Sequence, residues 1–313
     1  MILTGASHPP AQYRMISFNP PVKAGRLCNA LSIDVEDYFQ VQAFAGQIDR
    51  ADWDNHEWRF AANSHLILDL LDEAKVKATF FTLGWVAERA KPLIRRMADE
   101  GHEIASHGMA HYRADEQTPQ EFRRDVAQAK AILEDIGGMA VKGYRAATFS
   151  IGAGNMWAFD ILAEEGYLYS SSINPVKHDL YGLPEAPRAP FYPGSGRAIP
   201  EIPMTTVSLL ERNLPFSGGG FFRLLPYPVF KWGLRHVNRN DRLPCMFYMH
   251  PWEIDPLQPR IPEAPLKSRL RHYLNLGRTE TRLKRLLSDF EWDRVDRVYS
   301  SVIHPQQGSG AHD

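Results

Sequence analysis

Short apolar runs alternate with longer amphipathic segments through most of the chain. Residues 29–33 and 76–83 are apolar and rich in β-branched or aromatic side chains, a composition typical of buried strands. Further strands are predicted over 102–107, 141–147, 167–172 and 245–250. Helical spacing of apolar residues predicts helices over 64–74, 85–101, 118–138, 155–166 and 279–290. Because strand and helix recur about every 25–35 residues, we expect βαβ units around a parallel sheet.

Polar residues mark the starts of two of these helices. The helix over 118–138 opens on Thr118, and Glu121 follows three residues later, so the pair is expected to form a capping box. Asn63 stands directly before the helix over 64–74 and is the expected cap of that helix.

The chain is predicted to fold as one domain over residues 27–303. Residues 1–26 are rich in proline, serine and alanine without periodicity, and 304–313 have a similar character, so both ends are expected to be disordered. The proline-rich stretch 184–203 is interpreted as a long surface connection. At least six strands with intervening helices favour a single (β/α) barrel over an open sheet.

The charge balance argues against some classes of partner. Lys and Arg number 36 against 37 Asp and Glu, so a nucleic acid or an anionic membrane is not expected as the main partner, although local basic patches are compatible with this balance. No apolar run reaches the ~18–20 residues that span a bilayer, and the first 26 residues lack the pattern of a signal peptide. Cys28 and Cys245 suggest no disulfide framework, and a cytoplasmic protein is predicted.

Two groups of candidate ligands follow predicted strands. Asp34, Glu36 and Asp37 crowd the end of the first strand, where like charges repel unless a cation or hydrogen-bond donors hold them. His107 and His111 follow the third strand, four residues apart, and both rings could face one point if the segment makes a helical turn. Two imidazoles and one carboxylate with room for water are the ligand set of a catalytic divalent metal.

Two further polar residues belong to the same predicted edge. Arg145 lies within the fourth strand and His250 ends the last. In barrels and open parallel sheets, active sites sit at the carboxyl ends of the strands. Taken singly, Arg145 could be a structural ion pair and His250 a hydrogen-bonded histidine at a strand end, but their shared edge favours a catalytic role.

Four segments in this order resemble the NodB-homology polysaccharide deacetylases of carbohydrate esterase family 4. They are SIDVEDYF (32–39), GHEIASHGMAHY (101–112), GYRAATFS (143–150) and FYMHPWEIDPLQPR (247–260). The first and last are most similar to the subgroup associated with exosortase-type exopolysaccharide gene clusters. The resemblance implies an irregular (β/α)7 barrel as a single domain, with a C-terminal extension, and hydrolysis of N-acetyl groups on amino sugars.

The resemblance also implies roles for the polar residues. Asp34 corresponds to the general base, and His107 and His111 to metal ligands. The third ligand stays open between Glu36 and Asp37, because this chain separates the two acids that family members usually place side by side.

Three other residues receive roles by the same resemblance. Arg145 would orient the base and His250 would act as the acid. Ser170 stands where relatives often place the aspartate that supports the catalytic histidine, and the turn AATF replaces a proline-containing one, so reduced activity is one predicted consequence.

The implied cofactor is a divalent metal, with Zn²⁺ favoured by the ligand types and Co²⁺ or Ni²⁺ able to replace it. The implied partner is an N-acetylated glycan of exopolysaccharide biosynthesis, and Tyr38 and Trp252 are the predicted stacking platforms for its sugars. Two alternatives stay open: hydrolysis of another non-peptide C–N bond on the same fold, and a catalytically impaired glycan-binding homologue. The oligomeric state is not predicted.

Overall fold

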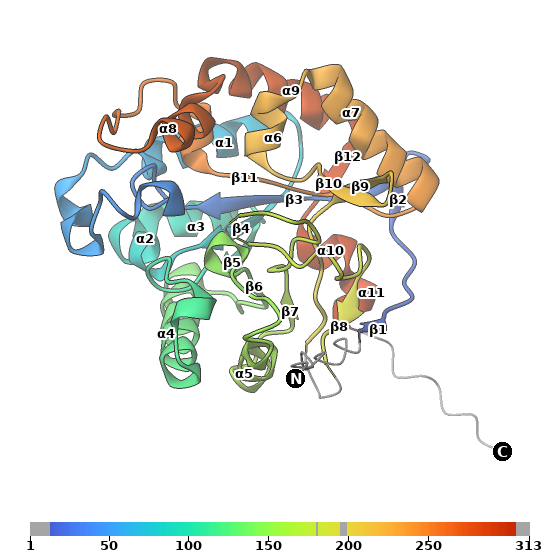
Figure 1. Ribbon diagram of the computed structural model, residues 1–313, viewed down its shortest axis with the longest axis horizontal. Coiled ribbons are helices and arrows are strands. Elements are labelled where there is room, and N and C mark those ends of the chain that lie inside the picture. The colour runs from blue at the N-terminus through green and yellow to red at the C-terminus, as the bar shows by residue number, and fades with distance from the viewer. Residues whose placement is uncertain (1–12, 180, 195–198, 305–313) are drawn as a thin grey trace, which may run out of the picture.

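A computed structural model describes residues 13–179, 181–194 and 199–304. Its centre is a parallel sheet with the strand order β11-β3-β4-β5-β6-β7. The strands are β3 (Arg26–Val35), β4 (Thr79–Thr82), β5 (Glu103–Ser106), β6 (Gly143–Tyr144), β7 (Tyr169–Ser170) and β11 (Met246–Met249). β3, which comes first in the chain among these six strands, is therefore interior to the sheet and lies between β11 and β4 (Figure 1).

The sheet curls towards closure between β7 and β11. Glu201 forms a parallel bridge with Ser170 of β7, and Gly218 forms one with Tyr248 of β11. The stretch 184–203, predicted as a surface connection, thus contributes a buried pairing segment instead, because Glu201 is fully buried. The curled α/β sheet in one domain agrees with the predicted irregular barrel.

β3 organises the sheet because it has partners along both halves. Its first half pairs with β12 (Glu291–Asp293) and with β2 (Val22–Lys23), and its second half pairs with β11 and β4. All residues from Cys28 to Val35 are buried. A strand covered on both faces needs a nearly continuous apolar sequence, which explains the run that precedes Asp34.

Helices surround the sheet (Figure 1). Those before β7 are α1 (Phe60–Glu73), α2 (Gly84–Arg89), α3 (Lys91–Asp99), α4 (Pro119–Gly137) and α5 (Trp157–Glu164). Those after it are α6 (Gly219–Leu224), α7 (Tyr227–His236), α8 (Leu266–Tyr273), α9 (Thr279–Asp289), α10 (Val295–Val298) and α11 (Ser300–Ile303). The predicted capping box of α4 is present, with Thr118 Oγ1 accepting from Glu121 N and Glu121 Oε2 accepting from Thr118 N.

Two predicted helices differ in detail. The single helix expected over 85–101 is divided into α2 and α3 at Ala90, because Pro92 lacks an N–H and its ring excludes a continuous helix. α1 begins at Phe60, so Asn63 lies inside the helix and does not cap it.

The predicted lead-in is partly ordered. β1 (Arg14–Met15) pairs with β8 (Phe191–Tyr192), and β2 pairs with β3, so the expectation of disorder is wrong for residues 13–26. The ring of Tyr13 packs edge-on against Phe191, which anchors this part of the chain. Residues 1–12 and 305–313 lie outside the described part.

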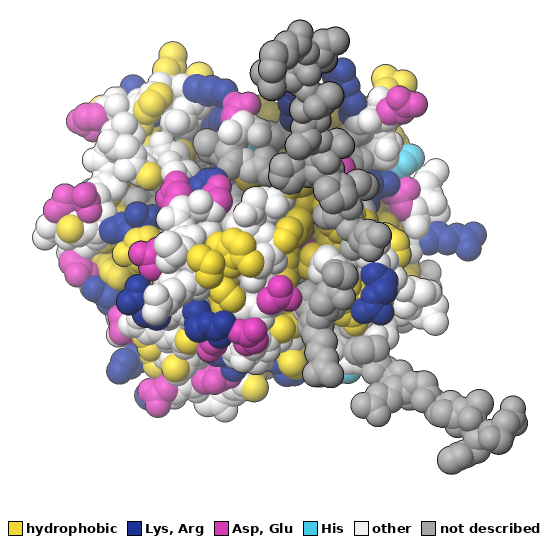
Figure 2. Space-filling model, turned by 60° about the horizontal axis from the view of Figure 1, so that its bottom comes forward, with side chains coloured by type: hydrophobic (Ala, Val, Ile, Leu, Met, Phe, Trp, Pro, Cys, Tyr) yellow, Lys and Arg dark blue, Asp and Glu magenta, His cyan; other side chains and the backbone are white. Residues whose placement is uncertain are grey.

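Cys28 and Cys245 are buried and form no disulfide, as predicted. No helix in the described part of the chain is long and apolar enough to cross a membrane, and the predicted cytoplasmic location stays a prediction. Acidic and basic side chains are interspersed on the face that Figure 2 shows, in keeping with the balanced composition.

The buried His102 makes stability depend on pH. Its Nδ1 accepts the N–H of Ala78, and burial, together with the charge of Lys77, lowers the pKa of His102 to about 3. The unfolded chain takes up this proton below pH 6.5 and the folded protein does not, so His102 lowers the free energy of unfolding as pH falls from 6.5 towards 3. In chemical denaturation, the stability advantage of wild type over His102→Asn should shrink by about 1.4 kcal/mol per pH unit in that window. If the free energies of unfolding of wild type and His102→Asn changed equally with pH, this role of His102 would be contradicted.

Candidate metal centre and active site

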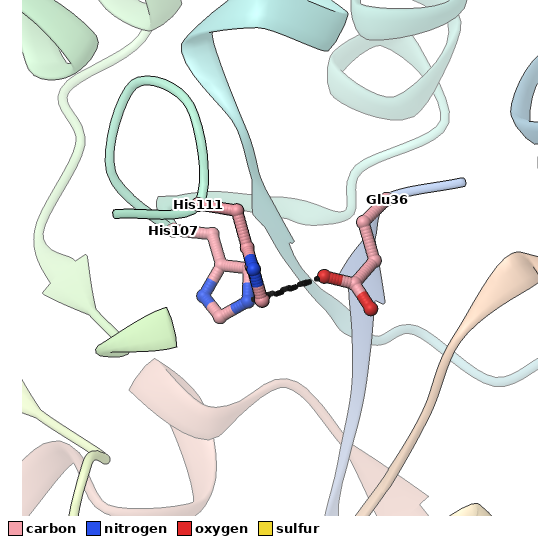
Figure 3. A group of neighbouring side chains, drawn as sticks. All are labelled: Glu36, His107 and His111. Atoms are coloured by element: carbon pink, nitrogen blue, oxygen red, sulfur yellow. Dashed lines mark ion pairs between the residues drawn. The ribbon is translucent and has the colours of Figure 1, made fainter. Parts of the chain in front are cut away.

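One carboxylate and two imidazoles converge beyond the carboxyl ends of β3 and β5 (Figure 3). Glu36 Oε2 lies 2.9 Å from Nε2 of His111 and 4.0 Å from Nε2 of His107. The three side chains are buried, and their potential ligand atoms lie within 4.8 Å of one another. These two strands lie on either side of β4 and run parallel, so their carboxyl ends bring together residues some seventy positions apart.

Backbone contacts fix both histidines. His107 Nδ1 lies 2.8 Å from the carbonyl oxygen of Arg145, so this nitrogen donates and Nε2 keeps its lone pair facing Glu36. The segment between the histidines is a loop and not the helical turn that the spacing would allow, because Gly108 and His111 have φ angles of +80° and +53°. Arg50 secures it by donating to the carbonyl oxygens of Ala110 and His111.

The three residues fit a divalent cation by their own chemistry. Glu36 Oε2 is buried and accepts no hydrogen bond among the described residues. Burial alone would raise the pKa of Glu36, but the neighbouring His111 and His250 outweigh it and lower the pKa to about 2. Burial lowers the pKa of His107 to about 4. An ionised carboxylate beside a neutral imidazole is the state in which these groups bind metal.

Asp37 has a different function from its neighbour Glu36. Its Oδ2 accepts the backbone N–H groups of Arg59 (2.6 Å) and Phe60 (2.9 Å), and its Oδ1 accepts that of Tyr38 (2.8 Å). Asp37 therefore caps α1 across a gap of twenty-two residues. Of the two ligands left open by the sequence, the structure groups Glu36 with the histidines and directs Asp37 away from them.

Asp34 lies next to this cluster and is held by a buried arginine. Arg145 Nη1 donates to Asp34 Oδ1 at 2.6 Å and to the hydroxyl of Ser32 at 2.8 Å. The remaining guanidinium donors reach the carbonyl and hydroxyl oxygens of Ser171, and the guanidinium lies 4.0 Å from the centre of the Phe81 ring. The fully buried Arg145 thus holds one carboxylate oxygen of Asp34, and the other oxygen has no hydrogen bond among the described residues.

His250 is supported by a carboxylate that the sequence analysis missed. Its Nδ1 lies 2.8 Å from Oε1 of Glu253, and the other oxygen of Glu253 accepts from Arg223 Nε at 2.7 Å. Burial would lower the pKa of His250, but the carboxylates of Glu36 and Glu253 raise it to about 9. The sequence feature that could have indicated this support is the glutamate three residues after the histidine in HPWE. A glutamate at this spacing can reach back to the histidine, and Glu253 also accepts the backbone N–H of His250.

Ser170 does not take the supporting position that was predicted for it. Its hydroxyl donates to the hydroxyl of Ser172 at 2.8 Å, and it lies beside the buried Glu201. The carboxylate that holds His250 comes from its own turn, so the reason for expecting an impaired enzyme from Ser170 is removed.

The two predicted sugar platforms differ in their relation to the pocket. Tyr38 is fully buried against Phe39 and does not line the pocket, so the prediction that it stacks on sugars is wrong. Trp252 lines the pocket, and its ring stacks on His250 with 5.1 Å between ring centres. Its Nε1 also lies 3.5 Å from Glu36 Oε1, which makes Trp252 a wall of the site.

Comparisons with known proteins point to one family. Residues 53–166 match the family model described as polysaccharide deacetylase, and residues 171–300 match a domain of unknown function (DUF3473). This match assigns residues 53–166 to a polysaccharide deacetylase domain. A peptidoglycan-N-acetylglucosamine deacetylase of Bacillus cereus is 38% identical over 79 residues, 25% of this chain and 29% of that protein. A chitooligosaccharide deacetylase of Bradyrhizobium is 34% identical over 97 residues, 31% of this chain and 42% of that protein.

The curated relatives match a limited part of the chain, and the chain spans less than half of their length. The chain is also similar to a solved structure from Mycobacterium smegmatis that is provisionally assigned as a polysaccharide deacetylase. The superposition covers 94% of this chain and 96% of the other chain. Its TM-score is 0.59 at 19% sequence identity, which establishes a shared fold. The predicted fold class is confirmed, and the match over residues 53–166 agrees with the predicted polysaccharide deacetylase family, whereas the exopolysaccharide-associated subgroup stays a prediction.

The domain of unknown function completes the deacetylase domain instead of forming a separate unit. Its range, 171–300, contains β11, which pairs with β3, and β12, which pairs with the start of the same strand. It also supplies His250 and Glu253, whereas Asp34 and Glu36 precede both matched ranges. The residues of the site therefore come from both sides of the boundary between the two matched family ranges.

Substitution of the two neighbouring acids separates metal binding from helix capping. Glu36→Gln should abolish stoichiometric Zn²⁺ binding, because it removes the charge that faces the histidines. Asp37→Asn should keep the metal but lower the free energy of unfolding by about 1–2 kcal/mol, because one acceptor of the α1 cap is lost. Metal analysis after dialysis and thermal denaturation measure the two effects, and loss of metal in Asp37→Asn alone would reverse the assignment.

The support of His250 predicts a second contrast. Glu253→Gln should lower kcat for deacetylation by about 100-fold with little change in KM, because the orienting charge on Nδ1 is removed. Ser170→Asp should give no gain, since Ser170 faces Ser172 and Glu201. Higher activity in Ser170→Asp together with an unaffected Glu253→Gln would contradict this arrangement.

Proposed function

We propose that this protein is a divalent-metal-dependent deacetylase that removes N-acetyl groups from the amino sugars of a polysaccharide and releases acetate. The observation that carries the proposal is the convergence of Glu36, His107 and His111 on one point between Asp34 and His250. The five side chains line one pocket at the carboxyl end of the sheet. The family match and the names of the curated relatives support the same reaction class.

The pocket supports hydrolysis of a small acyl group at its base. It has a volume of about 150 Å³ and is open to solvent. Its walls add Thr148, Phe149, Tyr181, Tyr248 and Trp252 to the five polar side chains. A cavity of this size takes an acetamido group, and the aromatic rim is suited to the apolar face of a sugar.

Glu36, His107 and His111 would hold the metal. A bound divalent cation would supply Lewis acidity, which polarises an amide carbonyl and lowers the pKa of water. Zn²⁺ suits a set of two imidazoles and one carboxylate, and Co²⁺ or Ni²⁺ has similar ligand preferences.

The protein's own groups would move the protons. Arg145 donates a hydrogen bond to Oδ1 of Asp34, so the other oxygen of Asp34 is the one that would accept the proton of the attacking water. His250 Nδ1 faces Glu253, so Nε2 is the atom that gives a proton to the departing amine. Without that proton the amine would be a poor leaving group and the amide would re-form.

The polymer assignment rests on the segments SIDVEDYF and FYMHPWEIDP, whose resemblance to the exosortase-associated subgroup favours an exopolysaccharide. The curated relatives are named for peptidoglycan and chitooligosaccharide. A comparison of kcat/KM on N-acetylated exopolysaccharide fragments, peptidoglycan fragments and chitooligosaccharides distinguishes these substrates.

Acetate release from N-acetylated chitooligosaccharides tests the reaction. The zinc-loaded protein should release acetate, a chelator should abolish the release and added Zn²⁺ should restore it. Asp34→Asn should lower kcat by about 10²–10⁴-fold because it removes the base. Asp135→Asn, a change of the same type at an exposed position of α4, should leave the activity unchanged.

Activity that survives both complete metal removal and Asp34→Asn would overturn the proposal. A marked preference for amides that are not sugars would favour the alternative of another C–N hydrolase on this fold.

A further inference from the structure

α8 presents exposed leucines beside the catalytic end of the sheet. Leu266 and Leu270 are 67% and 61% exposed, and Leu257, in the preceding loop, is 82% exposed. Figure 1 shows α8 on the side of the molecule towards which the arrow of β3 points, the side that carries Glu36. Exposed leucines one helical turn apart form an apolar ridge with no partner among the described residues.

Cations flank this apolar ridge on both sides. At 100° per residue, Lys267 and Arg271 follow the two leucines on one side of the helix and Arg269 lies on the other. All three cations are exposed. Lys267 Nζ lies 3.0 Å from Asp179 Oδ2. Both side chains are exposed to solvent, which screens the charges, so this ion pair is weak. The segment 257–274 also contains Arg260, against the single acid Glu263, so the surface is basic.

The opposite face of α8 is tied to the active site through stacked rings. His272 is buried and stacks on Trp252 with 4.0 Å between ring centres and 12° between planes. Trp252 in turn stacks on His250 at 5.1 Å and 15°. His272 Nε2 also lies 2.6 Å from Oε1 of Gln258, which fixes the helix to the loop after the HPWE turn. The exposed leucines are thus rigidly placed relative to His250.

We propose that this α8 face, formed by Leu257, Leu266, Leu270 and the flanking cations, docks on an anionic phospholipid surface. A short amphipathic helix with leucines in the middle and Lys or Arg on both flanks inserts its apolar residues at the headgroup level and pairs its cations with lipid phosphates. Docking there holds the pocket close to the bilayer, so the substrate class is a glycan still attached to a lipid. This second step rests on the proposed deacetylase function, whereas the docking does not.

The charge pattern favours a lipid surface over a second copy of the chain. A symmetric dimer through this face would bring the cations of both copies together around the leucines, and like charges repel across an interface. Glycans offer no negative charge unless they are acidic, and sugars stack on rings better than on aliphatic side chains. A bilayer of anionic phospholipid complements both features.

Vesicle co-sedimentation of the full chain tests the docking, and it needs no turnover. The protein should bind vesicles of phosphatidylcholine with phosphatidylglycerol, and not vesicles of phosphatidylcholine alone. Leu266→Ser/Leu270→Ser should weaken this binding at least about tenfold, and Lys267→Gln/Arg271→Gln should reduce its dependence on salt. The matched control is Leu210→Ser, because Leu210 is 87% exposed in the hairpin of β9 (Thr206–Leu209) and β10 (Arg212–Pro215) near the other end of β3.

Activity on a soluble N-acetylated oligosaccharide separates the two proposals. The double leucine variant should retain full activity on the soluble substrate and lose activity on the same glycan linked to a lipid in vesicles. Failure of wild type to bind anionic vesicles, or equal weakening by Leu210→Ser, would overturn the docking. A wild-type dimer that Leu266→Ser/Leu270→Ser converts to a monomer, without an effect on vesicle binding, would also overturn it, since the face would then join copies of the chain.

Discussion

The burial of carboxylates at the carboxyl end of the sheet is the constraint on which the site depends. A carboxylate removed from water is stable only with a cation or several hydrogen-bond donors. Asp34 has Arg145, Asp37 has two backbone N–H groups of the α1 start and that of Tyr38, and Glu253 has an arginine and a histidine. Glu36 differs from these, because its buried Oε2 accepts no hydrogen bond among the described residues and faces imidazole nitrogens. This difference in partners separates the proposed ligand from the structural acids.

The sheet brings the parts of the site together through β3. Because β3 pairs with β4 on one side and β11 on the other, its end lies between the histidines that follow β5 and His250 that follows β11. Arg145 comes from the end of β6 and reaches across the sheet to Asp34. The matched domain of unknown function is thus necessary for the proposed chemistry, since it supplies the proposed acid and the carboxylate that orients it.

Local contacts explain where predictions from sequence spacing failed. The four-residue spacing of His107 and His111 suggested a helical turn, but the positive φ angles of the loop produce the same convergence without a helix. Asn63 is a residue type that often caps helices, but it lies inside α1. The carboxylate of Asp37, from a distant loop, already accepts the first N–H groups of that helix. Ser170 was assigned by its place in a motif, and the contact that matters to His250 comes from Glu253 instead.

The sequence by itself determined the alternation of strands and helices, the capping box of α4 and the set of residues at the catalytic edge, because apolar periodicity and motif order are local properties of the chain. Only the tertiary structure decided between Glu36 and Asp37. Neighbouring residues of a loop point in different directions, and their partners, the imidazoles after β5 and the first N–H groups of α1, come from distant parts of the chain. Of the three acids in the DVED segment, only Glu36 therefore needs a bound cation. Asp34 and Asp37 find their hydrogen-bond donors within the fold.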